Sequence, residues 1–346
     1  MSSKLGFSEW PFHTLPDEDF VKIWCGRQDL YRELDSVFRR LIQKPGFQIR
    51  LIYGDFGAGK THGIRHMLNK YRKSADLLTA ELEYDITIRT FTQLYESLIN
   101  RMDFAPMNNW SVPPSAPKVR DFGSFYKNLK SDDDVKQALA VQWLAGQEKS
   151  KRALGGIGIK NAITDTDTAV RAFSELTKLA GKNRSAVVLF IDEFQHVGKL
   201  NVNWRENILN GLTKLVNESP NHLCLIISFR LKMPINILSI IPENMVQRFS
   251  GNTFIEFKNF SREEAADFMK CLFQEFRCTK TQDDYFPYTR DAFEEVLSYL
   301  AAHHVEYNPR SLMKIFDHVS QSFEDAEENT PISGESIKKC LQTYSA

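Results

Sequence analysis

The stretch Gly54-Asp55-Phe56-Gly57-Ala58-Gly59-Lys60-Thr61 decides the fold of this chain, because it spaces three glycines, a lysine and a hydroxyl residue as G-x-x-x-x-G-K-[ST]. An apolar run, 47–53, precedes it and reads as a strand. A helical pattern, 61–73, follows it. In this strand–loop–helix setting, small residues let the backbone wrap around a phosphate, whereas a chance glycine turn lacks the flanking elements. The stretch therefore predicts a nucleotide-binding loop.

Each part of this loop has a predicted role. The backbone N–H groups and the N-terminus of the following helix face negative charge. The Lys60 ammonium would contact the β- and γ-phosphates, and the Thr61 hydroxyl would bind Mg²⁺. We therefore predict that the cofactors are ATP and magnesium. The predicted nucleotide-binding residues of the loop are Gly54, Asp55, Phe56, Gly57, Ala58, Gly59, Lys60 and Thr61.

A second segment, Val187–Glu193, is a near-continuous apolar run that ends in two carboxylates. Such a run is typical of a strand buried on both faces of a parallel sheet, and ligands of open α/β sheets bind at the carboxyl ends of the strands. Asp192 would hold Mg²⁺ through water, and Glu193 would orient the attacking water, which indicates hydrolysis. The alternative is an acidic decoration of a helix start. The preceding phosphate loop favours the catalytic interpretation.

Alternating strands and helices predict an α/β fold, a doubly wound parallel-sheet core. We assign residues 1–257 to this core, with an irregular N-terminal segment, 1–26, and an insertion at about 104–165. The strand pattern stops near residue 258, and residues 258–346 are predicted to form a small helical lid domain. Its four predicted helices are 261–276, 291–302, 309–323 and 333–343.

The composition is that of a soluble globular protein, with 42% apolar and 25% charged residues among 346. Lys plus Arg and Asp plus Glu each total 44, so no net field attracts nucleic acid, although a local basic patch stays possible. The chain shows no signal peptide and no apolar run of ~20 residues, so we expect a cytoplasmic protein without a membrane partner. Five scattered cysteines predict reduced thiols rather than zinc or disulfides.

Four further segments resemble AAA+ P-loop ATPases. The strand Leu223–Arg230 ends in a polar residue, as the sensor-1 strand does in that family, and Ser228 matches best. An ordinary strand-terminal serine is the alternative. The segment Asn244–Ser250 resembles the one that carries the arginine finger in initiator-type members. The resemblance implies that Arg248 stabilises transition-state charge in a neighbouring subunit, whereas a surface ion pair is the alternative.

The other two segments lie near the two ends of the chain. Tyr307–Leu312 resembles the sensor-2 motif, which implies that Arg310, in the first turn of a lid helix, reaches back to the γ-phosphate. A solvated arginine is the alternative. Trp24–Arg27 resembles the Gly-Arg segment that lies near the adenine in this family, which implies nucleotide contacts from Gly26 and Arg27.

The resemblance covers most of residues 20–325. It is strongest to the branch that holds origin-recognition initiators, TnsC-like transposition regulators and ATPases of prokaryotic defence systems. Initiators append a winged-helix DNA-binding domain, whereas these 346 residues end with the lid. That difference counts against an origin initiator.

Basic residues in the insertion are the candidates for nucleic-acid contact. In AAA+ members that form rings or filaments, loops before the strand that ends in the two carboxylates line the central channel, where cations contact phosphates. A solvated helix face beside the glycine-rich run 155–158 is the alternative. The candidate residues are Lys149, Lys151, Arg152 and Lys160.

Two functions of different classes follow. The first is a DNA-associated AAA+ ATPase that binds and hydrolyses Mg-ATP, assembles with itself in the ATP state and regulates or loads a partner enzyme, as in transposition or phage defence. Double-stranded DNA is then its expected partner. The second is a nucleotide-gated signalling module that binds protein partners without nucleic acid. The residues leave the pathway, the partner, the DNA preference and the choice between ring and filament open.

Overall fold

A computed structural model gives the fold. It describes residues 4–13, 20–43, 46–75, 77–110, 120–218, 221–231, 234–241, 243–246, 253–278, 283–324 and 331–344. The centre is a five-stranded parallel sheet in the order β2-β3-β4-β1-β5. The strands are β1 (Gln48–Tyr53), β2 (Leu78–Glu83), β3 (Val187–Asp192), β4 (Leu223–Phe229) and β5 (Phe254–Glu256). The predicted α/β class with a parallel sheet is confirmed.

The burial of β3 and β4 explains why the sequence of 187–193 predicted a strand. Every residue of β3 and β4 is buried, so both strands are apolar along almost their whole length. Their parallel register pairs Ile191 with Ile227, and β1 pairs Ile52 with Ser228. The polar ends of β3 and β4 therefore lie side by side at one edge of the sheet.

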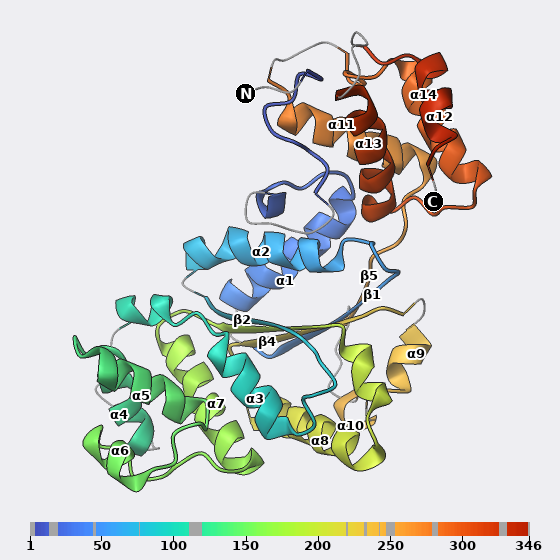
Figure 1. Cartoon of the computed structure of the whole chain (residues 1–346). Helices are drawn as coiled ribbons and strands as arrows, with labels where there is room; N and C mark the ends of the chain where they lie inside the picture. The colour runs from blue at the N-terminus through green and yellow to red at the C-terminus, as the bar shows by residue number, and fades with distance from the viewer. Residues whose placement is uncertain are drawn as a thin grey trace. The chain divides into compact units, whose positions relative to one another are not determined.

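Helices cover both faces of the sheet (Figure 1). One face carries the later turns of α1 (Gln28–Gln43) and α2 (Lys60–Ala75), which are joined where the Asp35 carboxylate accepts hydrogen bonds of 2.6 Å from Lys70 and Tyr71. The other face carries a layer of three helices, and this arrangement confirms the doubly wound core. These helices are α3 (Phe91–Asn100), α7 (Thr166–Lys182) and α8 (Val202–Glu218).

The described part of the insertion contains four helical elements. Asp133 and Ser150 cap two of its helices, because their side chains accept hydrogen bonds from backbone N–H groups of the first turn. The rings of Phe125 and Trp143, 5.7 Å apart, lie in its core. The elements are η2 (Ala105–Asn109), α4 (Arg120–Leu129), α5 (Asp134–Leu144) and α6 (Lys151–Gly156).

The predicted helices of residues 258–346 are all present. Ser261 opens the first with a capping box, in which its hydroxyl and the Glu264 side chain satisfy each other's backbone N–H groups. The helices are α11 (Arg262–Phe276), α12 (Arg290–Ala302), α13 (Pro309–Glu324) and α14 (Gly334–Leu341). The N-terminal segment packs into their core through Phe7 and Phe12, which contact Phe273.

The chain groups into two compact units, each assembled from separated stretches. The first unit comprises Met1–Arg32, Gly54–His66 and Phe257–Ala346. The second comprises Glu33–Tyr53 and Met67–Glu256. The phosphate loop thus groups with the C-terminal helices, and the assignment of residues 1–257 to a core and 258–346 to a lid stays a prediction.

The remaining short helices connect the larger elements. They are η1 (Phe20–Lys22), η3 (Phe194–Lys199), α9 (Pro234–Leu238) and α10 (Glu243–Val246). Over the described ranges, no helix has an apolar stretch that could cross a membrane.

Candidate nucleotide site

The backbone of the phosphate loop has positive φ at three glycines, and two of them are also closely packed. Gly57 has φ +82° and Gly54 has φ +147°, both in the region that L side chains rarely adopt. A Cβ atom at Gly54 would lie 2.4 Å from the carbonyl oxygen of Phe257, and one at Gly57 would lie 2.8 Å from the Cβ of Arg310. Phe257 and Arg310 therefore pack so closely against the loop that a side chain at Gly54 or Gly57 would clash with them.

Lys60 is the first residue of α2, and its side chain turns back into the loop. It is only 7% exposed, and its Nζ donates hydrogen bonds of 2.9 Å to the carbonyl oxygens of Gly54 and Asp55. The helix begins with a bond from Gly63 N–H to Gly59 O, so the N–H groups of its first turn point toward the loop. A buried cation beside these N–H groups fits a polyphosphate.

Arg27 braces the loop from the N-terminal side. Its Nη1 donates a hydrogen bond of 2.6 Å to Ala58 O, and its Nη2 donates to Lys258 O. Its guanidinium also lies 4.1 Å from the ring centroid of Phe260. Burial lowers the pKa of Arg27 to about 10, against the opposing influence of Glu264, so the side chain stays charged at neutral pH. The predicted Gly26–Arg27 segment thus contacts the backbone of the loop.

The first turn of α13 braces the loop from the C-terminal side. The Arg310 N–H donates to Gly57 O at 3.4 Å, and its guanidinium carbon lies 4.0 Å from the ring centroid of Phe56. Asn308 opens this turn, since its Oδ1 accepts a hydrogen bond of 3.0 Å from Ser311 N–H. The structure therefore brings the predicted lid arginine to the phosphate loop.

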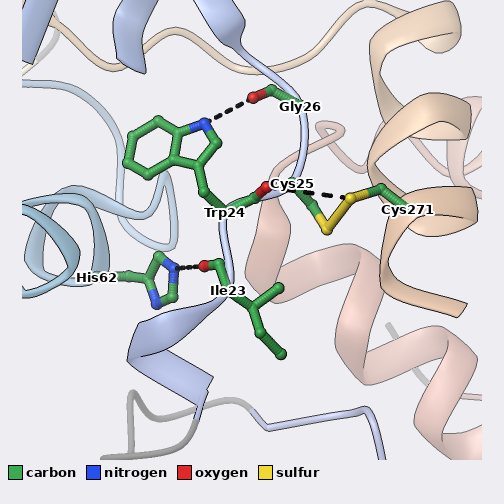
Figure 2. Close-up of a disulfide and its surroundings, with 6 residues drawn as sticks. All are labelled: Ile23, Trp24, Cys25, Gly26, His62 and Cys271. Atoms are coloured by element: carbon green, nitrogen blue, oxygen red, sulfur yellow. Dashed lines mark hydrogen bonds between the residues drawn. A yellow bond between two sulfur atoms is a disulfide. The ribbon is translucent and has the colours of Figure 1, made fainter. Parts of the chain in front are cut away.

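The N-terminal segment also holds the outer face of α2, a contact that the sequence did not reveal. His62 Nε2 bonds to Ile23 O at 3.0 Å, as Figure 2 shows, and His66 Nδ1 bonds to Val21 O at 2.9 Å. The Trp24 ring lies 5.3 Å from the His66 ring. In the sequence, the two histidines stand one helical turn apart. This spacing gave no partner.

Cys25 and Cys271 form a disulfide between this segment and α11 (Figure 2), with Cα atoms 5.6 Å apart. The expectation of five reduced thiols was therefore wrong for this pair. A sequence separation of 246 residues leaves no spacing pattern to read, so only the fold brings the two sulfur atoms together. Cys224, Cys278 and Cys340 are free thiols.

The acidic edge of the sheet lies in the second unit. Asp192 is 6% exposed at the end of β3, and its Oδ1 accepts hydrogen bonds from the Ser228 hydroxyl and from Glu193 N–H, the latter at 2.9 Å. Ser228, the predicted sensor-1 residue, is fully buried. The two predicted residues are therefore direct partners, because β3 and β4 are neighbours in the sheet.

Gln195 is a residue at this edge that sequence reasoning missed. Its Nε2 donates a hydrogen bond of 2.6 Å to Glu193 Oε2, and its Oε1 accepts one of 2.9 Å from Arg230 N–H. Glu193 itself has φ +54°, an uncommon conformation for a residue other than glycine. The amide thus ties the Glu193 carboxylate to the end of β4. No sequence motif marks Gln195, because its contact with the Glu193 carboxylate depends on the turn of the backbone in η3.

Comparison with known proteins bears on this arrangement. The model of the AAA ATPase domain family matches residues 23–226, which are 204 of the 346 residues and include the phosphate loop and Asp192–Glu193. This chain belongs to the AAA ATPase domain family. Membership of this family implies that the chain binds a nucleotide. No curated protein matches its sequence.

Solved structures support the fold of this AAA ATPase. The ORC1 protein of Aeropyrum pernix, solved in complex with DNA, aligns with a TM-score of 0.55 and 15% identity, over 99% of this chain and 70% of that chain. Drosophila ORC bound to DNA aligns with 0.55 and 13%, over 98% and 65%. Aeropyrum pernix ORC2, in ADPNP-ADP complexes, aligns with 0.54 and 12%, over 95% and 71%. At such identities the likeness shows the fold alone.

The nucleic-acid candidates of the AAA ATPase belong to the insertion. The four basic candidates are exposed, and the Ser150 cap places Lys151 and Arg152 in the first turn of α6. The backbone N–H of Lys160 donates to Asp121 at 2.8 Å. Arg248, the predicted arginine finger, lies outside the described residues.

Proposed function

We propose that this AAA ATPase binds Mg-ATP at the phosphate loop, hydrolyses it, and assembles with itself on DNA in the ATP state as a regulator or loader of a partner enzyme. The observation that carries the proposal is the buried ammonium of Lys60, held against the carbonyls of Gly54 and Asp55 in a loop that requires glycine. An ammonium taken out of water in this way favours a dense anionic ligand such as a triphosphate.

Each side chain then has one task. Lys60 contacts the β- and γ-phosphates, and Arg310 contacts the γ-phosphate from α13. Thr61 and Asp192 hold the magnesium ion, which supplies charge neutralisation on the phosphate oxygens when bound. Glu193 accepts a hydrogen bond from the attacking water and orients it.

Two neighbours support the acidic side chains in these tasks. Ser228 donates a hydrogen bond to Asp192 and thereby fixes the carboxylate that faces the metal. Gln195 holds the Glu193 carboxylate through its side-chain amide. Both neighbours act through another residue, so they position the acidic groups rather than take part in the reaction.

Assembly and DNA association rest on separate support. Arg248 is the proposed finger in trans, so a complete site forms only between two copies of the chain. The similar structures from Aeropyrum pernix and Drosophila were solved with DNA, and Lys151 and Arg152 are exposed on α6 of this chain. We propose these two side chains as phosphate contacts. The resemblance to TnsC-like regulators and to ATPases of prokaryotic defence systems supports a transposition-type or defence-type role.

A second function is favoured by one specific contact. The first turn of α13 lies directly on the phosphate loop through Arg310 and Gly57, so nucleotide can change the contact of helix and loop. Such a change would serve as a latch for a protein partner, without DNA.

The test measures ATPase rate against protein concentration, with and without duplex DNA, for wild type and Lys60→Ala. We expect no nucleotide binding by Lys60→Ala, a wild-type rate that rises more than linearly with concentration, and stimulation by DNA that falls steeply with salt. A concentration effect without any DNA effect would favour the latch. Hydrolysis by Lys60→Ala at the wild-type rate would refute the assigned site.

A further inference from the structure

Phe56 is an aromatic residue in the middle of the phosphate loop, with 49% of its surface exposed. The backbone at this position only has to wrap a phosphate, so the loop has no need of a large ring there. The ring instead faces a cation, because the Arg310 guanidinium carbon lies 4.0 Å from its centroid. A guanidinium within about 6 Å of an aromatic face is attracted by the ring quadrupole.

The first turn of α13 brings Arg310 to the loop. Its N–H donates to Gly57 O at 3.4 Å, and a Cβ atom built at Gly57 would lie 2.8 Å from the Cβ and 3.5 Å from the Cδ of Arg310. At the far end of this side chain, the guanidinium contacts the face of Phe56. This contact restricts the positions that the guanidinium can take.

We propose that Phe56 is the positioning residue for Arg310, and that its ring sets how strongly the protein prefers ATP over ADP. The proposal rests on the proposed function, because it assigns Arg310 to the γ-phosphate, which ADP lacks. An arginine already held at the loop loses less side-chain freedom when the γ-phosphate binds. The ring therefore favours ATP binding and leaves ADP binding nearly unchanged.

The proposal distinguishes an aromatic face from apolar bulk. Leucine keeps apolar volume at position 56 but has no quadrupole, whereas tryptophan has the strongest one among the natural rings. At a half-exposed site the loss of a cation–π contact corresponds to about a two- to fivefold change in an equilibrium constant.

The experiment measures the dissociation constants of ATP and ADP, with magnesium, by calorimetry on the full chain. We expect Phe56→Leu and Phe56→Met to lower the ratio Kd(ADP)/Kd(ATP) about two- to fivefold, and Phe56→Trp to keep it. In an Arg310→Ala background, Phe56→Leu should change nothing further. The matched control is Trp204→Leu, which removes another exposed ring beneath an arginine, Arg89, at 4.4 Å in the second unit.

An unchanged ratio in Phe56→Leu and Phe56→Met would overturn the proposal, as would an equal fall in the Arg310→Ala background. Thermal melting of each variant separates lost folding from lost preference. Failure of the proposed function would be recognised differently, because wild type would then bind ATP no better than Lys60→Ala does.

Discussion

The phosphate loop and the acidic edge are positioned in different ways. Asp192 and Ser228 come together because β3 and β4 are adjacent parallel strands in one sheet, so regular backbone pairing sets their separation. The loop is braced by the segments 24–27, 257–260 and 308–311, which come from both ends of the chain. The acidic edge thus depends on strand register. The phosphate loop depends on contacts between distant segments.

This difference predicts how the phosphate loop and the acidic edge respond to substitution. Substitutions at the acidic edge should alter the reaction and leave the fold of the phosphate loop intact. Substitutions that break the braces should alter nucleotide affinity and stability, even where they touch no nucleotide atom. Five experiments test the contrast.

The largest effect is expected at the acidic edge. Glu193→Gln keeps the shape of the side chain but removes its charge, so turnover should fall by about 10²–10⁴ while ATP affinity is kept. Steady-state rates and binding constants are measured in parallel. The matched control is Glu83→Gln, an exposed carboxylate paired in register with Asp192 on β2. A wild-type rate in Glu193→Gln would break the assignment of this edge to the reaction.

The Cys25–Cys271 disulfide tests the segments that hold the phosphate loop. Cys25→Ser should lower the free energy of unfolding by about 2–4 kcal/mol, because the bridge closes a loop between residues 246 apart in the sequence. Urea unfolding with and without a thiol reductant measures the loss. Cys278→Ser, an exposed free thiol, is the control and should stay within about 0.5 kcal/mol of wild type.

Alkylation identifies the bridge directly. Burial raises the pKa of the Cys224 thiol to about 12, with Arg50 opposing, so this group stays protonated at neutral pH. Cys278 should therefore react first, and Cys25 and Cys271 should react only after reduction. Equal labelling of Cys278, Cys25 and Cys271 before reduction would contradict the disulfide.

Gly57→Ala should weaken ATP binding about tenfold. Its φ of +82° costs an L residue roughly 1–2 kcal/mol, and the new Cβ would lie 2.8 Å from atoms of Asn308 and Arg310. Binding constants and melting temperatures are compared with those of Gly155→Ala. A Cβ at Gly155 meets nothing within 4 Å, so that variant should stabilise α6 by about 0.5–1 kcal/mol. Wild-type ATP binding by Gly57→Ala would show that the brace from α13 is dispensable.

The smallest effect is expected in the insertion. Replacing Lys151 and Arg152 by alanine should lower the slope of log K against log salt for DNA by about two, and leave nucleotide affinity unchanged. The control replaces Lys338 and Lys339, an adjacent basic pair on α14. An identical slope in both double variants would remove α6 from the proposed DNA contacts.

Much of the fold followed from local patterns. The expected strand 47–53 and helix 61–73 agree with β1 and α2 to within two residues, and the four C-terminal helices appear where periodicity and caps placed them. Apolar runs and caps are local signals, so a single sequence carries them. The grouping of the phosphate loop with the C-terminal helices carried no such signal, because it depends on contacts across some 250 residues.

The candidate site divides in the same manner. Gly54–Thr61 and Asp192–Glu193 were visible as motifs, because phosphate and metal chemistry restricts the residue types that can serve there. Gln195, the Cys25–Cys271 bridge and the ring of Phe56 beside Arg310 were not visible, since a glutamine, a cysteine or a phenylalanine acquires its role only from its neighbours.

The amino-acid sequence alone determined which segments carry the candidate chemistry and their order along the chain. A glycine loop with Lys60 comes first, and a buried strand that ends at Asp192 follows. Only the tertiary structure decided which side chains support them, with Arg27 and Arg310 on the loop and Ser228 and Gln195 at the acidic edge. The physical reason is that motif residues are constrained by the bonds they make to a ligand, whereas supporting residues are constrained by where the folded chain happens to pass.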